Sequence, residues 1–285
     1  QAAPKTYQLK SPDGRIEVTV EAGEGISYMM TCCGDVILEK SPAAMCLTDG
    51  TVFGGAQKVS KVSRRTVDQT IPTPVYRKSE VRDNYNELTL KFKKFSVVFR
   101  AYDEGMAYRF ISNMKKPFEV AKEVAAFAFP EDWNMWVPYV NQHLQTLESQ
   151  LWNSFENRYK YVSLSAWDKE RYGFLPLMVD APKGRKVVIT EADLMDYPGM
   201  YLYNGDADAS LEAMFAPYPK EIKQGGHNNL QGEVQSREEY IAAYDGAVSF
   251  PWRIVNVSTQ DKEMLDNDLV WLLGEPADLQ TDWSW

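Results

Sequence analysis

Alternating apolar and polar residues dominate the first half of the chain, and this period of two predicts β-strands. Residues 16–21 alternate strictly between apolar and polar side chains, and they follow the turn sequence SPDG at 11–14. Residues 88–93 repeat the pattern, and the sequence DEG at 103–105 predicts a hairpin between two further apolar stretches. Strands with one buried face and one face in water are typical of antiparallel sheets.

Helical periodicity is scarce along the chain. Only residues 258–273 carry a helix start signal, with Ser258 or Thr259 as N-cap and with Asp261 and Glu263 in the first turn. Residues 141–161 fit neither the helical nor the strand pattern throughout, so this segment is left unassigned. Many strands and few helices favour an all-β protein of stacked antiparallel sheets, with a few short helices near the C-terminus.

One strand carries a carboxylate inside an otherwise apolar pattern. In the sequence VVITEADLMDYPGMYL, residues 187–202, the period of two continues through Glu191 and Asp193, which predicts that both lie on one face. A carboxylate buried in a sheet is costly unless a cation or hydrogen-bond donors compensate it. Glu191 is therefore a candidate metal ligand or supporting residue of a catalytic site. The alternative is a carboxylate at the sheet edge, in contact with water.

Length and charge exclude several classes of protein. The 285 residues are enough for one large all-β domain or two smaller ones, and 44% of them are of the apolar class. No apolar run of about 18 residues occurs, so no membrane span is expected. The net charge of -9 argues against a nucleic-acid partner. Cys32, Cys33 and Cys46 fit neither a metal spacing nor an even disulfide framework, and we interpret them as small buried thiols.

The aromatic residues raise the hypothesis of a free-standing carbohydrate-binding module, because aromatic faces pack on sugar rings. Those between residues 133 and 167 are Trp133, Trp136, Tyr139, Trp152, Tyr159, Tyr161 and Trp167. Core packing is the alternative use of such residues. A mutarotase-like sugar isomerase is a further hypothesis, with His143 or His227 and Glu191 as acid and base. No phosphate-binding loop, nucleophile elbow or helical histidine pair occurs, and spacing selects no pair of catalytic carboxylates.

Several motifs resemble the N-terminal domain of glycoside hydrolase family 97. They are ITEADL at 189–194, DYPGM at 196–200, SPDGRIEVTV at 11–20, DEGMAYRF at 103–110, AFAFPEDWNMW at 126–136, RYGFLPLMV at 171–179 and FPWRIVNVSTQDKEMLDNDLVWLL at 250–273. The resemblance covers essentially the whole chain, and it implies an antiparallel β-supersandwich of the galactose-mutarotase-like type. It also implies that residues 1–285 are a single N-terminal domain, with 258–285 leading to a (β/α)8 catalytic barrel beyond the chain.

The same resemblance implies a function. Family members hydrolyse α-glycosidic bonds as α-glucosidases or α-galactosidases, so the expected partners are such glycosides and the barrel. Because the catalytic carboxylates belong to the barrel, we expect no catalytic residue here and no activity of the chain alone. The resemblance further implies an exported protein of the bacterial periplasm or cell surface.

Residue roles also follow from the resemblance. Glu191 matches the family position that donates a ligand to a calcium ion beside the sugar site. Calcium takes about six to eight oxygens, so we expect the isolated domain to bind none tightly. Trp252, Arg253 and Trp167 are expected at the substrate or at the junction with the barrel, and packing against their own sheets is the alternative.

Overall fold

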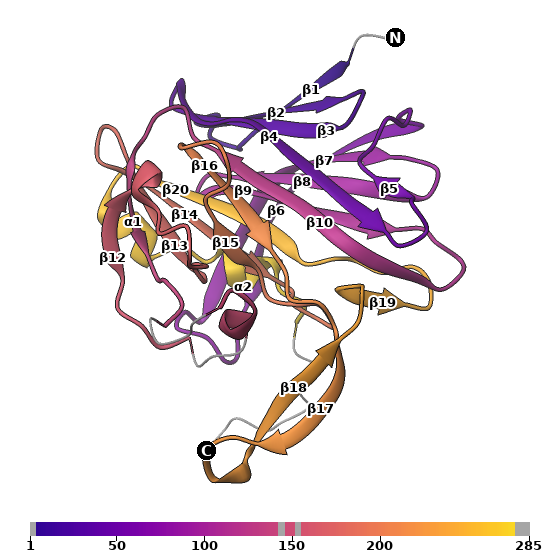
Figure 1. The fold of residues 1–285 in the computed structure, drawn as a ribbon. Coiled ribbons are helices and arrows are strands. Elements are labelled where there is room, and N and C mark those ends of the chain that lie inside the picture. The colour runs from indigo at the N-terminus through magenta and orange to yellow at the C-terminus, as the bar shows by residue number, and fades with distance from the viewer. Residues whose placement is uncertain (1–3, 142–145, 152–154, 277–285) are drawn as a thin grey trace.

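Two large antiparallel sheets stacked face to face make up most of the protein, and a two-stranded hairpin projects from one end (Figure 1). The computed structural model describes residues 4–141, 146–151 and 155–276. The predicted all-β class, the antiparallel sandwich and the short helices near the C-terminus are confirmed. Within the described residues, no helix is long and apolar enough to cross a membrane.

The first sheet has the strand order β1-β2-β3-β4-β10-β16-β15, with β5 paired to β4 and β19 paired to β10. Its strands are β1 (Lys5–Lys10), β2 (Ile16–Ala22), β3 (Ile26–Cys32), β4 (Asp35–Leu47), β5 (Val52–Phe53), β10 (Phe118–Ala128), β15 (Tyr201–Tyr203), β16 (Ser210–Met214) and β19 (Ala242–Tyr244). Every pairing is antiparallel, as the alternating sequence pattern predicts.

The second sheet has the order β12-β11-β13-β14-β20-β9-β8-β7-β6. Its strands are β6 (Lys61–Pro72), β7 (Glu80–Lys91), β8 (Phe95–Tyr102), β9 (Gly105–Ser112), β11 (Asn134–Val137), β12 (Lys160–Ser163), β13 (Leu177–Ala181), β14 (Arg185–Ala192) and β20 (Trp252–Ser258). The projecting hairpin is β17 (Pro219–Gly225) and β18 (Gln231–Arg237). The helices are η1 (Glu148–Leu151), η2 (Leu164–Ala166), η3 (His227–Asn229), α1 (Asp261–Leu265) and α2 (Leu269–Leu273).

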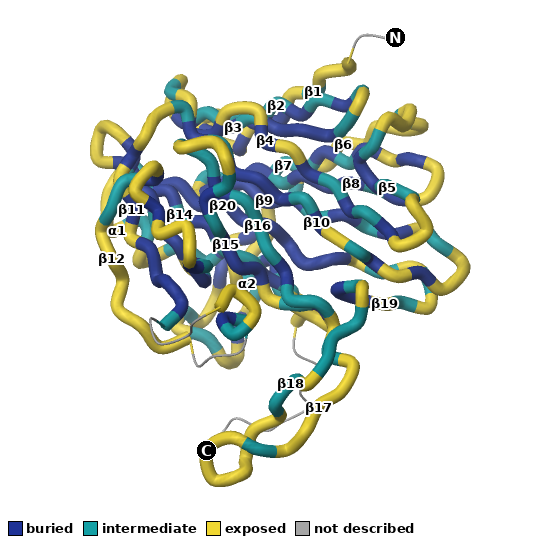
Figure 2. The backbone as a smooth tube through the Cα atoms, viewed as in Figure 1, coloured by how far each residue is buried: buried dark blue, intermediate teal, exposed yellow. Residues whose placement is uncertain are grey.

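The core lies between the inner faces of the two sheets, where the strands are most deeply buried (Figure 2). Strand β2 alternates buried with partly exposed residues, as residues 16–21 predict. The predicted hairpin is also present, because Tyr102 of β8 pairs with Gly105 of β9 across a two-residue loop. The hairpin β17–β18, by contrast, is mostly exposed on both faces.

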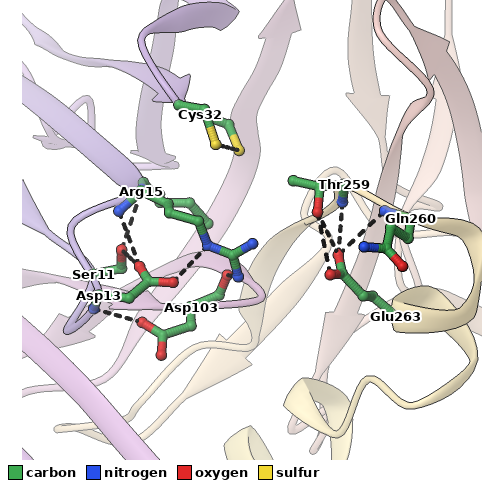
Figure 3. Close-up of polar contacts among 10 residues, drawn as sticks. Ser11, Asp13, Arg15, Cys32, Asp103, Thr259, Gln260 and Glu263 are labelled. Carbon is green, nitrogen blue, oxygen red and sulfur yellow. Dashed lines mark hydrogen bonds and ion pairs between the residues drawn. The ribbon is translucent and has the colours of Figure 1, made fainter.

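Carboxylates fix two local turns (Figure 3). Asp13 accepts hydrogen bonds from Ser11 Oγ at 2.7 Å and Arg15 Nε at 2.6 Å, which closes the turn between β1 and β2. At the start of α1, Glu263 accepts hydrogen bonds from the backbone N–H groups of Thr259 at 2.7 Å and Gln260 at 3.3 Å. This is a capping box with Gln260 as N-cap.

The prediction of one helix over residues 258–273 is wrong. Strand β20 runs through Ser258, so the helix starts later than its sequence signal indicates, and residues 266–268 separate α1 from α2. The break is held by the loop between β6 and β7. Asp268 accepts hydrogen bonds from Tyr76 Oη and Arg77 Nη2, both at 2.8 Å, and from Lys78 Nζ at 2.5 Å. These contacts hold α1 and α2 on the outer face of the second sheet.

Candidate functional site

Glu191 lies near the end of β14, directly opposite Arg253 of the antiparallel strand β20. Arg253 Nη1 donates to Glu191 Oε2 at 2.6 Å. The backbone N–H of Met200 donates to Glu191 Oε1 at 3.1 Å and to Oε2 at 3.3 Å. The Glu191 side chain is only 13% exposed. The interpretation of Glu191 as a carboxylate in water is therefore wrong, since a cation and an N–H group compensate its burial.

Asp193 does not share the face of Glu191, so that prediction is wrong. Strand β14 ends at Ala192, and Asp193 has a backbone φ of 59° that interrupts the alternation. Asp193 Oδ2 accepts a hydrogen bond from Arg109 Nη1 at 3.0 Å. Arg109 alternates along β9 with core residues such as Tyr108, so its side chain lies on the outer face of the second sheet.

Arg253 joins the two sheets of the sandwich. Its Nε and Nη2 donate to Glu123 Oε1 and Oε2 of β10, each at 2.7 Å. The side chains of Arg253 and Glu123 are 1% and 3% exposed. Tyr197 Oη donates to Glu123 Oε2 at 2.8 Å, which ties the segment after β14 to the same cluster. Glu123, Arg253, Glu191 and Tyr197 thus form one connected, buried polar network.

Two carboxyl groups share one guanidinium in this network. Burial opposes the charge of Arg253, but Glu123 and Glu191 outweigh burial and raise its pKa well above the ordinary value. Burial raises the pKa of Glu191, while Arg253 and the Met200 N–H act to lower it. Burial and Glu123 raise the pKa of Tyr197, which stays a neutral donor. The network therefore joins two carboxyl groups to a single guanidinium.

A cavity of about 710 Å³ opens beside Glu191. Its lining includes the loop residues Tyr197 to Met200 and, from the base of the β17–β18 hairpin, Tyr218 and Arg237. The volume falls in the usual range of ligand sites, about 300–1,000 Å³. Large apolar side chains are exposed around it, including Phe155 at 51% and Leu194 at 44%. Glu191 therefore lies at the wall of a surface cavity and is not sealed between the sheets.

The cavity supplies only part of a metal site. Glu191 and Asp196 are the carboxylates among its described lining residues. No group of three or more His, Cys, Asp or Glu side chains within the described parts of the chain is arranged to hold a metal ion. Carboxylate oxygens suit calcium, which takes about six to eight oxygen ligands. Glu191 therefore offers oxygen atoms of the type that suits calcium, but the described lining of the cavity does not supply a complete set of ligands.

Comparison with known proteins identifies the family. A family model described as "Glycosyl-hydrolase 97 N-terminal" matches residues 9–276. The chain belongs to this glycosyl hydrolase 97 N-terminal family. The resemblance inferred from the motifs is thereby confirmed.

Two curated relatives of this glycosyl hydrolase 97 domain are longer proteins. The chain is 48% identical to the "Retaining alpha-galactosidase" of Bacteroides thetaiotaomicron, over 99% of this chain and 43% of the relative. It is 23% identical to the "Probable retaining alpha-galactosidase" of Streptomyces bingchenggensis, over 96% of this chain and 38% of that protein. The chain thus spans less than half the length of these relatives.

Solved structures share the fold. A glycoside hydrolase family 97 enzyme from Pseudoalteromonas sp. strain K8, in complex with acarbose, superposes with a TM-score of 0.79 at 21% identity. The match covers 96% of this chain and 39% of the enzyme. A β-arabinopyranosidase gives a TM-score of 0.78 at 21% identity, covering 97% of this chain and 44% of that chain.

The other predicted site residues lie inside the glycosyl hydrolase 97 domain. Trp252 is 1% exposed, and the guanidinium carbons of Arg109 and Arg100 lie 4.4 and 4.8 Å from the centroid of its ring. Trp167 is 4% exposed and donates from Nε1 to the carbonyl oxygen of Arg171 at 2.9 Å. Both tryptophans therefore pack within the domain, which is the alternative given for them above. Arg253 is equally buried and does not line the cavity, but it donates to Glu191, which does.

The residues nominated for isomerase chemistry are not brought together within the described structure. His227 is exposed in η3, between β17 and β18 in the hairpin arm, and does not line the cavity beside Glu191. His143 lies outside the described residues, as does Trp152 of the aromatic group. The other aromatic residues divide into two sets. Trp133, Tyr139 and Trp167 are buried, whereas Trp136, Tyr159 and Tyr161 are exposed.

Glu123 and Tyr197 are site residues that the sequence pattern alone did not reveal. Strand β10 buries Phe118 and Val120, and the period of two predicts that Lys122 continues this face. A β-bulge between Val120 and Lys122 shifts the register by one residue. Glu123 is therefore buried and faces Arg253 across the sandwich. The sequence does show that Glu123 is a charged residue beside an apolar run. It gives no clear indication of the bulge that turns Glu123 toward the core.

Proposed function

We propose that the chain is the N-terminal domain of an exported α-glycoside hydrolase, where it packs against a catalytic domain and forms one wall of the sugar pocket. α-Galactosides are the proposed substrate class, and α-glucosides are the alternative. Membership of the glycosyl hydrolase 97 family supports the role of the domain. The name of the 48% identical relative, a retaining α-galactosidase, supports the substrate. Export rests on the motif resemblance alone.

The observation that carries this proposal is the position of Glu191. Glu191 lines a cavity of ligand size, while Arg253 and the Met200 N–H hold its carboxylate by hydrogen bonds. A carboxylate that served only to stabilise the sandwich would not need to lie at a cavity. A carboxylate that serves a ligand needs both the opening and the rigid support.

Glu191 is the residue of this chain that would hold calcium, and calcium would act there as a Lewis acid and orient the sugar. The chain's own contribution is to place one carboxylate. Arg253 fixes the direction of the Glu191 carboxylate, and Glu123 fixes Arg253 through two parallel hydrogen bonds. Tyr197 completes the support by donating to Glu123.

The surface around the cavity supports contact with a second domain. Met195 is 68% exposed and Tyr218 is 52% exposed, in addition to Phe155 and Leu194. A cluster of large exposed apolar side chains beside a cavity is typical of an interaction surface. In the proposed enzyme the catalytic domain covers these side chains and closes the cavity on its open side.

A chimera tests the proposal. This chain would replace the matched region of the B. thetaiotaomicron α-galactosidase, and hydrolysis of an aryl α-galactoside and an aryl α-glucoside would be followed. We expect turnover by the chimera, with the galactoside preferred, and none by the chain alone. Turnover by the chain alone would refute the assignment. So would a chimera with a cooperative thermal transition that hydrolyses neither substrate.

A further inference from the structure

The outer face of the second sheet carries a row of side chains that ends in exposed aromatic rings. Trp136 of β11 is paired with Tyr161 of β12 on one side and Met178 of β13 on the other. Met178 is paired with Val188 of β14, and Val188 with Asn256 of β20. With strands about 4.8 Å apart, the row from Trp136 to Asn256 spans about 14 Å. It is long enough for more than one sugar ring.

The aromatic end of the row is open to solvent and held in place. The rings of Trp136 and Tyr161 have centroids 4.7 Å apart, and the side chains are 39% and 46% exposed. Tyr161 Oη donates to Asp180 Oδ2 at 2.7 Å, which fixes its ring. Tyr159 is 42% exposed and donates to the carbonyl oxygen of Pro176 at 2.9 Å. Three aromatic side chains are thus presented at the surface in fixed positions.

A cavity of about 510 Å³ lies along this row, separate from the cavity beside Glu191. Trp136 and Tyr159 line one part of it, and Val270 of α2 lines another. Asn256 also lines it and is 4% exposed, and its Oδ1 is buried without a hydrogen-bond partner. The oxygen itself is not accessible, so the polar side chains that remain for a ligand are those of Thr190 and Asn267, which also line the cavity.

The chemistry of the lining limits the ligand. None of its described residues carries a charge, and the polar ones are the hydroxyl and amide side chains of Thr190, Asn256 and Asn267. The rest are aromatic or aliphatic side chains. Such a surface suits a neutral molecule with one apolar face and many hydroxyl groups. It offers nothing to pair with a phosphate or a carboxylate.

We propose that this cavity is a carbohydrate subsite that binds a short, neutral oligosaccharide. A sugar ring stacks on Trp136, with Tyr159 beside it, and the next ring lies along the cavity, where Thr190 and Asn267 offer hydrogen-bonding groups. The subsite is distinct from the cavity beside Glu191. The proposal for the subsite does not depend on whether Glu191 is a calcium ligand. Its role is to hold glycan near the enzyme without taking part in the chemistry.

Titration calorimetry on the 285-residue chain tests the subsite, with maltotriose and melibiose as probes at millimolar concentrations. We expect saturable binding of at least one probe. Trp136→Ala removes the stacking platform and is expected to weaken that binding about tenfold or more. Val270→Arg places a long side chain at the cavity from an exposed position of α2, without changing a strand, and is expected to weaken it as much.

The control is Leu230→Ala, which alters an 80% exposed side chain that lines neither cavity and should leave this binding unchanged. Thermal unfolding of each variant verifies that it is folded. If Trp136→Ala does not fold, Val270→Arg still tests the proposal. Absence of binding to both probes would overturn the proposal. Binding that survives both Trp136→Ala and Val270→Arg would overturn it as well, because the sugar would then lie elsewhere.

Discussion

Arg253 and Glu191 lie opposite each other on neighbouring strands, and one guanidinium nitrogen of Arg253 reaches the Glu191 carboxylate at 2.6 Å. The other two nitrogens hold Glu123 of the facing sheet. Both sheets therefore converge on one cation, and the carboxylate at the cavity is the outermost member of the network. The position of Glu191 depends on the assembly of the whole sandwich.

Removing the guanidinium should destabilise the domain strongly. In Arg253→Met, Glu123 is left as a buried carboxylate without a cation, and we expect the free energy of unfolding to fall by about 3–5 kcal/mol. Urea denaturation of the chain measures this loss. Arg158→Met is the matched control, because Arg158 is exposed, and it should change stability by less than about 0.5 kcal/mol. Equal effects of the two substitutions would contradict the role of Arg253.

Asp268 should give a pH-dependent contribution to stability. Burial opposes its charge, but hydrogen bonds from Lys78, Arg77 and Tyr76 outweigh burial and lower its pKa below 3.8. A lowered pKa means that the stabilisation is present above pH 3.8 and is lost as the pH falls through the folded-state value. At neutral pH, Asp268→Asn should cost about 1 kcal/mol.

The measurement for Asp268 is thermal or urea unfolding of both proteins from neutral to acid pH. The difference between wild type and Asp268→Asn should shrink as the pH falls below 3.8. A difference that grows toward acid pH would show the opposite sign of linkage. Hydrogen exchange should at the same time show faster exchange in α1 and α2 of the variant.

The two adjacent cysteines should differ in reactivity. Cys33 is exposed in the turn between β3 and β4, so its interpretation as a buried thiol is wrong, whereas Cys32 is buried at 2% exposed. Burial raises the pKa of the Cys32 thiol to about 11, so little thiolate forms near neutral pH. Iodoacetamide should therefore label Cys33 rapidly and Cys32 slowly, as measured by peptide mass spectrometry. After denaturation, both cysteines should be labelled equally. Equal labelling of both in the folded chain would contradict this account.

Gly105 should not tolerate a side chain. A Cβ at this position would lie 2.4 Å from the carbonyl oxygen of Val255 and 2.8 Å from Cα of Asn256, because β9 and β20 approach closely there. We expect Gly105→Ala to lower stability by about 2–3 kcal/mol. In Gly25→Ala the nearest atom would be 3.5 Å away, so this control should cost less than about 1 kcal/mol. Similar unfolding midpoints for the two variants would show that β9 moves aside.

The strands were predictable from the sequence because each has one buried face, which forces a period of two on residues 16–21 and 88–93. The features that the pattern misjudged all depend on contacts distant in sequence. The break between α1 and α2 is held by Arg77 and its neighbours, 191 positions from Asp268. Glu123 turns inward through a bulge. Asp193 leaves the face of Glu191 because the strand ends one residue earlier.

The candidate site was predicted in part. The strand pattern indicated Glu191, because a carboxylate interrupts an otherwise apolar strand. Its expected role as a calcium ligand came from the family resemblance and not from residue spacing. The pattern could not reveal that Arg253 is its partner, because pairing between β14 and β20 joins residues 62 positions apart. Burial also separates the aromatic residues into a core set and an exposed set, and the sequence alone does not distinguish them.

The central claim is that Glu191 provides an oxygen ligand for a cation that a catalytic domain also binds. Calcium affinity of the chimera with the B. thetaiotaomicron enzyme tests this claim most directly, measured by isothermal titration after chelation. We predict that the chimera binds one calcium ion, that Glu191→Gln weakens binding by about tenfold or more, and that the chain alone shows no tight binding. Equal calcium affinity in the folded chimera and its Glu191→Gln variant would contradict the account.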